Sequence, residues 1–391
     1  MTIFTPTPTD LEIEEAITWR HTLHRMPELA FEEHLTSAFV AERLSSFGLE
    51  VSTGLGGTGV VGTLRRGISK RAIGLRADMD ALPITEATGL TYASTHPGKM
   101  HACGHDGHTA MLLAAARHLS TRDDFDGIIH FVFQPAEENE GGARRMVEDG
   151  LFEVHPMAAI FGIHNWPALP VGQVGVIAGP MMAAFGIFNI TIRGKGSHAA
   201  MPHQGVDPLA CAFQIGSALQ TIVARNVSPM SPAVVSVTTV HGGDAWNVIP
   251  ESCKLTGTAR WFEPVVGDLL EANLKRVVTS IAEALGCTVD IDYQRRYPAT
   301  INNPTEARFV QNVVRGSDCG LVLAEDIQPS MAAEDFAFML EKCPGTYIWL
   351  GAGCAGDNPG LHSPHYDFND KILPLGVALW VSIALERLRA L

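Results

Sequence analysis

The chain has 391 residues, of which 46% are apolar and 18% are charged, and its formal net charge at pH 7 is −14. This length exceeds what one hydrophobic core usually serves, so we expect two domains. So acidic a protein would be repelled by a phosphate backbone or an anionic membrane surface, and we therefore expect neither nucleic acid nor a membrane as a partner.

The cysteines and the apolar segments indicate a compartment. Seven cysteines are scattered along the chain with no CxxC spacing, which argues for reduced thiols and against a disulfide framework. The first residues, MTIFTPTPTDLEIEEAI, show no secretory signal. The longest apolar run, residues 372–385, is too short to span a bilayer and predicts a buried terminal helix. We expect a soluble, cytoplasmic protein.

In the first half of the chain, short runs rich in Val and Ile alternate with helical patterns. Strands are expected from Val60, Ala72, Ile128 and Ala158, and a helix from Thr109. This alternation predicts a layered α/β domain. The last two strands are apolar on both faces, as in a sheet covered by helices on both sides. Polar side chains follow them, where open α/β sheets place their ligands.

The alternation of strands and helices that is typical of the first half of the chain gives way to a different order near residue 186. The expected elements are a strand at 185–194, a helix at 206–225, strands at 233–243 and 253–262, a helix at 264–286 and a strand at 287–297. The order β-α-β-β-α-β is the ferredoxin-like arrangement.

After residue 300 the α/β pattern returns, with helices near Glu306 and from Glu334, a strand at 345–353 and the terminal helix. We therefore expect one α/β domain formed by residues 1–184 and 299–391, with a ferredoxin-like domain, residues 185–298, inserted into it. The Gly/Pro-rich stretch that begins at Pro167 is the expected hinge.

The segment HACGHDGH, from His101, places three histidines, a cysteine and an aspartate within eight residues. In extended backbone His101, Cys103 and His105 would share one face, and His108 would lie near the start of the next helix. Thiolates and imidazoles are ordinary Zn²⁺ ligands, and a thiolate can also bridge two ions. Alternatively, the histidines bond backbone groups in a turn and Cys103 is a small buried residue; matching groups downstream favour the metal.

Glu137 and Glu138 follow the end of an expected strand, where neighbouring side chains point opposite ways. We expect one to bind metal and the other to act as a base, taking a proton from water and returning it to a leaving nitrogen. The alternative is a solvated acidic turn at a helix start.

Two histidines and two aspartates lie at other strand ends. His164 is expected to close its strand and His362 to lie where a loop leaves the sheet. Asp78 and Asp80, after another strand, would orient ligating imidazoles through their second nitrogens. Alternatively, these aspartates are a polar strand end without a metal role.

Several longer segments are distinctive in combination. They are GLRADMDALPITE at Gly74, HACGHDGHTAML at His101, FQPAEENEGGARRMVEDGLF at Phe133, GIHNWP at Gly162, GKGSHAAMPHQGVDP at Gly194, NVIPE at Asn247, AAEDF at Ala332 and HSPHYDF at His362. Together they resemble the hippurate hydrolase branch of the aminoacylase-type co-catalytic metallopeptidases, over nearly the whole chain. That branch is related to N-acyl-amino-acid amidohydrolases, N-acetyldiaminopimelate deacetylase and plant hydrolases of auxin–amino acid conjugates.

The resemblance implies an α/β catalytic domain with an inserted ferredoxin-like lid. It implies Glu137 as the general base and five metal ligands, which are Cys103, His105, Glu138, His164 and His362. The wider superfamily has His-x-Asp where this chain has Arg76-Ala77-Asp78, and a bridging Asp where it has Cys103. The number and identity of the ions therefore stay open, as one or two of Mn²⁺, Zn²⁺, Co²⁺ or Ni²⁺.

In the lid, the resemblance implies that His198 helps to polarise the scissile carbonyl, while Asn247 and Arg260 receive the carboxylate of the substrate. The alternative for Arg260 is a solvated charge on an edge strand. Donors in a lid imply closure over the substrate. By analogy, two copies are expected to pair through an exposed lid edge as a homodimer.

The leading functional hypothesis is a metal-dependent amidohydrolase that cleaves N-acyl (acetyl, benzoyl or related) L-amino acids to a carboxylate and a free amino acid. The alternatives are a dipeptidase or an N-carbamoyl-amino acid hydrolase with the same site, and a catalytically silent metal-binding relative. Five residues either line an acyl pocket or belong to the core: Met181, Met182, Phe185, Trp246 and Met331.

Overall fold

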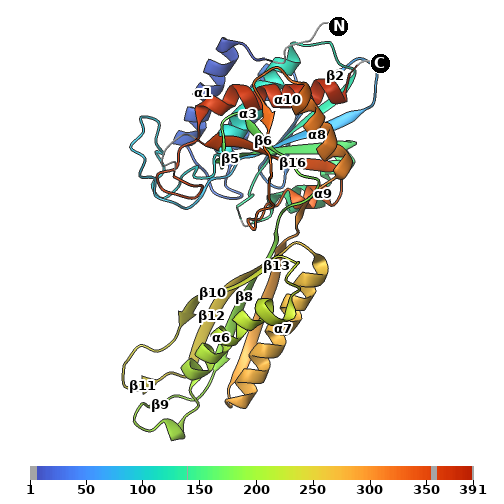
Figure 1. Ribbon diagram of the computed structural model, residues 1–391. Helices are drawn as coiled ribbons and strands as arrows, with labels where there is room; N and C mark the ends of the chain where they lie inside the picture. The colour runs from blue at the N-terminus through green and yellow to red at the C-terminus, as the bar shows by residue number, and fades with distance from the viewer. Residues whose placement is uncertain (1–6, 139, 354–358, 390–391) are drawn as a thin grey trace. The chain divides into compact units, whose positions relative to one another are not determined.

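The structure, a computed structural model, describes residues 7–138, 140–353 and 359–389. The chain divides into two compact units (Figure 1). The first unit comprises Met1–Met181, Thr300–Gln328 and Asp335–Leu391, and the second comprises Met182–Ala299 and Pro329–Glu334. The first unit is therefore discontinuous in sequence.

The first unit is built on a mixed eight-stranded sheet with the order β1-β2-β4-β3-β5-β16-β6-β15. Its strands are β1 (Glu50–Leu55), β2 (Gly59–Arg66), β3 (Ala72–Asp78), β4 (Gly127–Gln134), β5 (Ala159–Pro170), β6 (Gln173–Gly175), β15 (Val322–Leu323) and β16 (Gly345–Gly353). The central strands β4, β3, β5 and β16 run parallel, and β3 is buried at every position. A two-stranded sheet pairs β7 (Gly179–Met182) with β14 (Thr300–Asn302).

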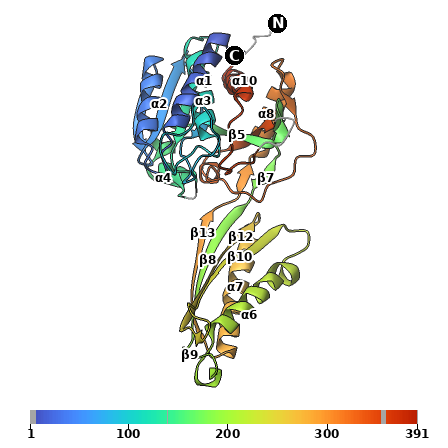
Figure 2. The ribbon, with the colours of Figure 1, turned by 90° about the vertical axis from the view of Figure 1, so that its left-hand side faces the viewer.

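Helices of the first unit cover this sheet (Figure 2). They are α1 (Asp10–Arg25), α2 (His34–Ser46), α3 (His105–Ser120), α4 (Gly142–Glu148), α5 (Leu151–Val154), α8 (Pro304–Gly316), α9 (Ala337–Leu340), α10 (Leu373–Arg387) and the 3₁₀ helix η2 (Asp370–Ile372). Helix α3 contacts α1, α2, α10 and β3, whereas α4 contacts α9 and β4. Because α3 and α10 are buried around most of their circumference, they form the centre of the large core.

Local sequence explains where several helices begin. A capping box between Thr9 and Glu12 starts α1, because each side chain accepts the other residue's backbone N–H. Asn303 caps α8 and is followed by Pro304 in the first turn, where a missing N–H costs nothing. The helix expected from Glu334 is only the four residues of α9.

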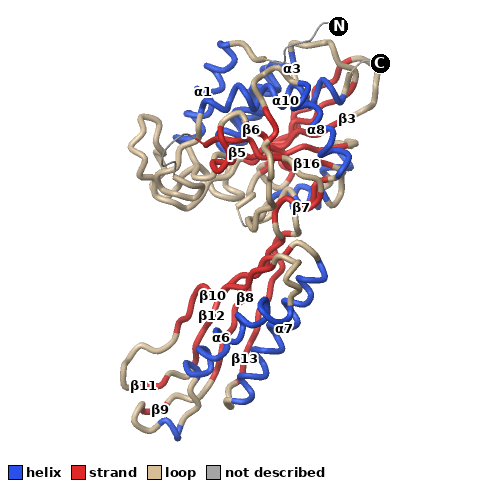
Figure 3. Tube along the Cα trace, viewed as in Figure 1, coloured by secondary structure: helices blue, strands red, loops and turns tan. Residues whose placement is uncertain are grey.

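The second unit has the order β-α-β-β-α-β (Figure 3). Its main elements are β8 (Ala184–Arg193), α6 (Pro208–Asn226), β10 (Ala233–His241), β12 (Ser252–Trp261), α7 (Pro264–Ala284) and β13 (Thr288–Tyr297). The antiparallel sheet has the order β10-β12-β8-β13, which is the ferredoxin-like topology.

The alternating burial of β8 and β12 gives this sheet one apolar face, against which α6 and α7 pack side by side. A short ribbon of β9 (Ser197–His198) and β11 (Val248–Ile249), with the 3₁₀ helix η1 (Pro202–Gln204), completes the unit. Within the described ranges, no helix combines the length and hydrophobicity that a bilayer crossing requires.

Candidate metal centre

The five predicted metal ligands come from four parts of the first unit. Cys103 lies in the loop before α3, His105 is the first residue of α3, and Glu138 follows β4. His164 lies in β5, and His362 lies in the loop before α10, with a left-handed backbone at φ 64°. The backbone N–H of His362 donates to the carbonyl oxygen of Ala102 at 2.8 Å, which ties this loop to the segment that carries Cys103.

Folding joins these five side chains in one continuous series of contacts. Ligand atoms of Cys103, His105 and Glu138 all lie within 4.8 Å of one another. The Cys103 Sγ atom is 3.4 Å from His164 Nε2. At the other end, His362 Nε2 is 3.2 Å from Glu138 Oε1. The set therefore offers one thiol, three imidazoles and a carboxylate to a common volume.

The surroundings of this set fit a bound cation. Burial, and after it the charges of Glu138 and Glu137, raise the pKa of the Cys103 thiol well above its ordinary value. Burial disfavours protonation of His105, but the carboxylates of Asp78 and Asp80 outweigh it and raise the pKa of His105 to about 10. The neighbouring carboxylates contribute to both shifts, and a divalent ion would balance their negative charge. The His105 Nε2 atom is also buried without a hydrogen-bond partner.

Asp80 holds two of these residues at once. One of its oxygens, Oδ1, lies 3.2 Å from His105 Nδ1, and the other accepts the backbone N–H of Glu138 at 2.9 Å. A hydrogen bond at Nδ1 fixes the ring orientation and leaves Nε2 for a metal. The contact agrees with the expected orienting role of Asp80.

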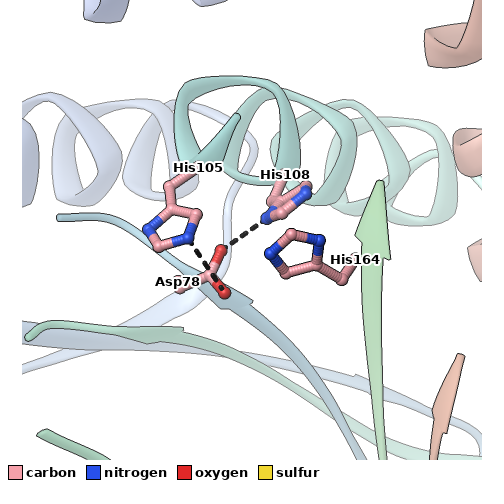
Figure 4. A group of neighbouring side chains, drawn as sticks. All are labelled: Asp78, His105, His108 and His164. Atoms are coloured by element: carbon pink, nitrogen blue, oxygen red, sulfur yellow. Dashed lines mark hydrogen bonds and ion pairs between the residues drawn. The ribbon is translucent and has the colours of Figure 1, made fainter. Parts of the chain in front are cut away.

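Asp78 lies between His105 and His108 (Figure 4), with its Oδ2 atom 3.8 Å from His105 Nε2 and a much shorter contact to His108. His108 Nδ1 is 2.6 Å from Asp78 Oδ1, and its Nε2 accepts the backbone N–H of Asn165 at 2.9 Å. Both ring nitrogens are thus engaged within the protein. Although Asp78, His105, His108 and His164 lie close enough to hold an ion, these bonds make His108 a structural member of the group.

His164 presents Nε2 to the site because its other nitrogen is engaged. Its Nδ1 lies 2.6 Å from the backbone oxygen of Asn165. Burial, followed by the charge of His108, lowers the pKa of His164 well below its ordinary value, so the ring is neutral, the form that binds metals.

The prediction that His164 closes its strand is wrong. Strand β5 continues to Pro170 because the residues after His164 keep pairing with β16. The expectation for His362 also needs correction, because β16 ends at Gly353 and His362 comes nine residues later in the chain.

The prediction that His101, Cys103 and His105 share an extended segment is wrong as well. Gly104 adopts φ 89°, and α3 begins at His105 rather than at Thr109. Only glycine fits there, since a Cβ atom would lie 2.6 Å from Asn165 Nδ2. His101 is buried with neither ring nitrogen hydrogen-bonded, and its ring centroid is 6.3 Å from that of His24.

Glu137 is buried but has different neighbours from Glu138. Its Oε1 atom lies 3.4 Å from the backbone N–H of Asp335. The preceding residue, Ala136, has φ 53°, which is unusual for a residue other than glycine and costs on the order of 1–3 kcal/mol. The paired carboxylates are therefore set by a strained turn rather than by continued strand geometry.

Asp335, whose backbone N–H lies near Glu137, belongs to a buried hydrogen-bond network around Arg76. The sequence analysis assigned this network no role. The Arg76 guanidinium donates to Asp78 Oδ2 at 2.8 Å, to Gln134 Oε1 at 2.8 Å and to Asp335 Oδ1 at 3.3 Å. The other Asp335 oxygen accepts the backbone N–H of Ala143 at 2.8 Å. A charged residue inside the apolar strand GLRADM was the available signal, because a buried charge requires partners.

The predicted catalytic residue His198 and the predicted substrate-binding residue Asn247 are neighbours in the second unit. His198 in β9 pairs with Val248 in β11, and the backbone N–H of Ala199 donates to the carbonyl oxygen of Asn247 at 3.0 Å. His198 Nδ1 accepts the N–H of Ala200 at 3.0 Å, so the ring proton is on the exposed Nε2.

Arg260 lies elsewhere in the same unit. It is near the end of β12, opposite Phe185, and its guanidinium lies 4.6 Å from the centre of that ring. The ribbon that carries His198 adjoins the other end of β12, about 26 Å away at ~3.3 Å per residue. Since β12 is an interior strand, the alternative of an edge-strand charge in solvent is wrong.

The candidate acyl-pocket residues do not share one environment. Met181, Met182 and Phe185 are buried, whereas Trp246 is 95% exposed. Trp246 is therefore not part of either core.

Comparison with known proteins identifies the family. The model of peptidase family M20/M25/M40 matches residues 74–386. The chain belongs to this family. It is 39% identical over 373 residues to the hippurate hydrolase of Campylobacter jejuni, covering 95% of this chain and 96% of that protein. It is 40% identical over 355 residues to N-acetyl-L-cysteine deacetylase of Bacillus subtilis, covering 90% and 83% of the two chains.

A solved structure agrees with this M20 fold. The Bacillus subtilis YXEP protein, described as a dinuclear metal-binding peptidase of the M20 family, superposes with a TM-score of 0.83 and 33% identity. The alignment covers 98% of this chain and 100% of the other. The resemblance and the α/β fold class inferred from sequence are confirmed, and this M20 protein is a metal-dependent hydrolase of amide bonds.

Proposed function

We propose that this M20 hydrolase cleaves the amide bond of N-acyl L-amino acids, with an acetyl, benzoyl or related acyl group, to give a carboxylate and a free amino acid. The observation that carries the proposal is the contact series from His362 through Glu138, Cys103 and His105 to His164. Glu137 is next to Glu138 in the chain, and its buried carboxylate lies near the backbone N–H of Asp335 rather than in this series.

The five residues of the series would hold one or two divalent ions, of Mn²⁺, Zn²⁺, Co²⁺ or Ni²⁺. When bound, such an ion supplies Lewis-acid activation of water and of the amide carbonyl. Asp80 would keep His105 and Glu138 in place for this task, since it contacts both.

Glu137 would act as the general base. Its carboxylate takes a proton from the attacking water and then delivers it to the amide nitrogen as the C–N bond breaks. The buried position of Glu137, next in the chain to the candidate ligand Glu138, supports this role.

We assign the second unit the role of a lid, with residues 185–298 as the inserted domain and residues 1–184 and 299–391 as the catalytic domain. His198 would donate from Nε2 to the substrate carbonyl, which its bond from Ala200 supports. Asn247 and Arg260 would bind the α-carboxylate.

A homodimer through the lid is part of the proposal. In one copy of the second unit, Arg260 and the His198–Asn247 pair lie at opposite ends of β12, about 26 Å apart by strand length, too far for one small substrate to touch both. If two copies pair, each site can take Arg260 from one lid and His198 from the other.

A cytoplasmic location is the remaining part of the proposal. The six cysteines of the described ranges are all free thiols, which suits a reducing compartment. The seventh, Cys354, lies outside the described residues.

The test is release of free amino acid from N-acetyl, N-benzoyl, N-indoleacetyl and N-carbamoyl amino acids and from simple dipeptides. The protein is stripped of metal and reloaded with Mn²⁺ or Zn²⁺. Metal-dependent release from the acyl amino acids supports the proposal, whereas preference for dipeptides or carbamoyl compounds selects the alternative substrates. No release with metal bound would favour the silent binding protein.

A further inference from the structure

The turn that carries Glu137 and Glu138 is held from a distant part of the chain. Ala136, at φ 53°, donates its backbone N–H to Glu33 Oε1 at 2.8 Å. Its carbonyl oxygen accepts the N–H of Gly142 at 2.9 Å. The left-handed residue is thus fixed on both sides, and one of the two contacts is a side chain 103 residues away.

Glu33 is fully buried just before α2, and its carboxylate makes two further bonds. Oε1 also accepts the backbone N–H of Phe31 at 3.0 Å, and Phe31 is itself left-handed, at φ 62°. Oε2 accepts the hydroxyl of Thr58 at 2.6 Å. One carboxylate oxygen therefore holds the N–H groups of two residues whose backbone conformations are otherwise unfavourable.

We propose that Glu33 is a positioning residue for the catalytic site, in that its carboxylate fixes the left-handed turn at Ala136 and so aims Glu137 and Glu138. The proposal rests on the function proposed above, since it presumes that Glu137 is the base and Glu138 a metal ligand. Glu33 itself touches neither carboxylate through any hydrogen bond seen in the described residues.

Loss of the Glu33 carboxylate would affect a buried donor and a strained dihedral of Ala136. Without Glu33, the Ala136 N–H is buried without this acceptor, and nothing offsets the strain of a positive φ. Relaxation of Ala136 to a negative φ would rotate the following peptide and redirect both glutamates. A general base must lie within hydrogen-bond reach of its proton, and a displacement of about 1 Å is enough to lower a rate strongly.

Glutamine is a suitable conservative replacement. Burial, with a further contribution from the charge of Asp80, raises the pKa of Glu33 to about 7, so the site already tolerates a neutral group. The glutamine oxygen can accept the N–H groups of Phe31 and Ala136, and its amide nitrogen can donate to Thr58.

Glu28 provides a matched control. It lies in the same loop, is also buried, and also accepts three bonds: from Leu35 N–H at 3.1 Å, Thr36 N–H at 2.8 Å and the Thr36 hydroxyl at 3.0 Å. None of these reaches the turn of Ala136. Glu28→Ala therefore removes as many bonds from the same loop without releasing the turn.

The experiment compares Glu33→Ala, Glu33→Gln, Glu28→Ala, Ala136→Gly and the double variant Glu33→Ala/Ala136→Gly in the full chain. The readouts are kcat and KM for N-acetyl and N-benzoyl amino acids at saturating Mn²⁺, the thermal midpoint, and titration with Co²⁺. Co²⁺ reports through its absorption spectrum, including the thiolate band expected from Cys103. If alanine at residue 33 prevents folding, Glu33→Met replaces it, since methionine has similar length without a strong acceptor.

We expect Glu33→Ala to lower kcat at least tenfold with little change in KM, and to weaken Co²⁺ binding at least fivefold. Glu33→Gln should stay within threefold of wild type. Glu28→Ala should lower the thermal midpoint with kcat within threefold. Because glycine adopts a positive φ without strain, the double variant should lie within threefold of Ala136→Gly.

If Glu33 had a purely structural role, Glu33→Ala and Glu28→Ala should have similar effects. The proposal is overturned if Glu28→Ala lowers kcat and Co²⁺ binding as much as Glu33→Ala, or if the effects of Glu33→Ala and Ala136→Gly multiply. If wild type cleaves no substrate, the proposed function fails, and the Co²⁺ titrations still decide whether Glu33 and not Glu28 shapes the site.

Discussion

The carboxylate of Asp80 lies 3.2 Å from Nδ1 of His105, and its second oxygen accepts the backbone N–H of Glu138. Two candidate ligands from different elements therefore depend on one buried side chain. Asp80→Ala should weaken divalent metal binding by about 10–100-fold, because it frees the His105 ring and the Glu138 backbone. Titration of the stripped protein with Co²⁺ measures this. Asp123→Ala, which removes an exposed acid, serves as the control, and equal affinity in both variants would contradict the role of Asp80.

Substitutions of the two adjacent glutamates, Glu137 and Glu138, should have different effects on metal binding and on kcat. Glu137→Gln should retain bound metal and lose about 10²–10⁴-fold in kcat, because only proton transfer is removed. Glu138→Gln should lose metal first, with activity returning in part at high metal concentration. Metal analysis by mass spectrometry beside steady-state kinetics separates the two; a Glu137→Gln variant with most of its activity would refute the assignment of the base.

Stability should depend on pH through His24 and Asp106, whose Nδ1 and Oδ2 atoms are 2.8 Å apart. Burial disfavours protonation of His24, but Asp106, with help from Glu86, outweighs it and raises the pKa to about 9. A raised folded-state pKa means that the contribution is fully present below pH 6.5 and is lost as the pH rises through about 9. It amounts to on the order of 3 kcal/mol.

The comparison is between wild type and His24→Gln in chelator, by denaturation at pH 6 and pH 9.5. The destabilisation caused by the substitution should be larger at pH 6. The same difference at both pH values would show that His24 is not protonated in the folded protein.

Arg76 should be a large contributor to stability. Arg76→Met leaves Asp78 and Asp335 buried without their shared cation, which should lower the free energy of unfolding by about 3–5 kcal/mol. Adding Asp335→Asn should recover part of the loss, because it removes one uncompensated charge. Urea denaturation measures both variants, and no recovery in the double variant would indicate that packing, not charge, explains the loss.

The proposed dimer predicts a mass of twice 42.0 kDa in sedimentation. Strand β10 is an edge of its sheet and exposes Val240, 44% accessible, so Val240→Lys should shift the protein toward monomer and lower activity. Val322→Lys is the matched control, since Val322 is 57% exposed on the edge strand of the other sheet. A monomeric wild type with full activity would refute the shared site.

Local periodicity was enough to predict much of the fold. The expected strand at 345–353 coincides with β16, and the six elements expected between residues 185 and 297 match the structure within two residues at every boundary. Such patterns are local, because alternation and helical spacing depend on which face of an element is buried. The residue types of HACGHDGH were enough to indicate the metal, since their chemistry does not depend on the backbone.

Tertiary contacts decided what local patterns missed. Helix α3 starts at His105 because Gly104 turns left-handed against Asn165, a contact between distant residues. Strand β5 continues past His164 because β16, formed by residues almost two hundred positions later, pairs with it. The dependence of Ala136 on Glu33 likewise joins residues 103 positions apart. The short stretches of sequence from which periodicity is recognised do not contain both members of such pairs.

The discontinuity of the first unit also sets an order of events during synthesis. Four of the five candidate ligands precede the second unit in the chain, and His362 follows it. The ribosome must therefore translate the whole ferredoxin-like insertion before the last ligand emerges. Until then, the nascent chain carries the other four candidate ligands without β16, which pairs with β5, or α10, which packs on α3. We therefore expect metal to bind at full affinity only after His362 has emerged and β16 and α10 have packed.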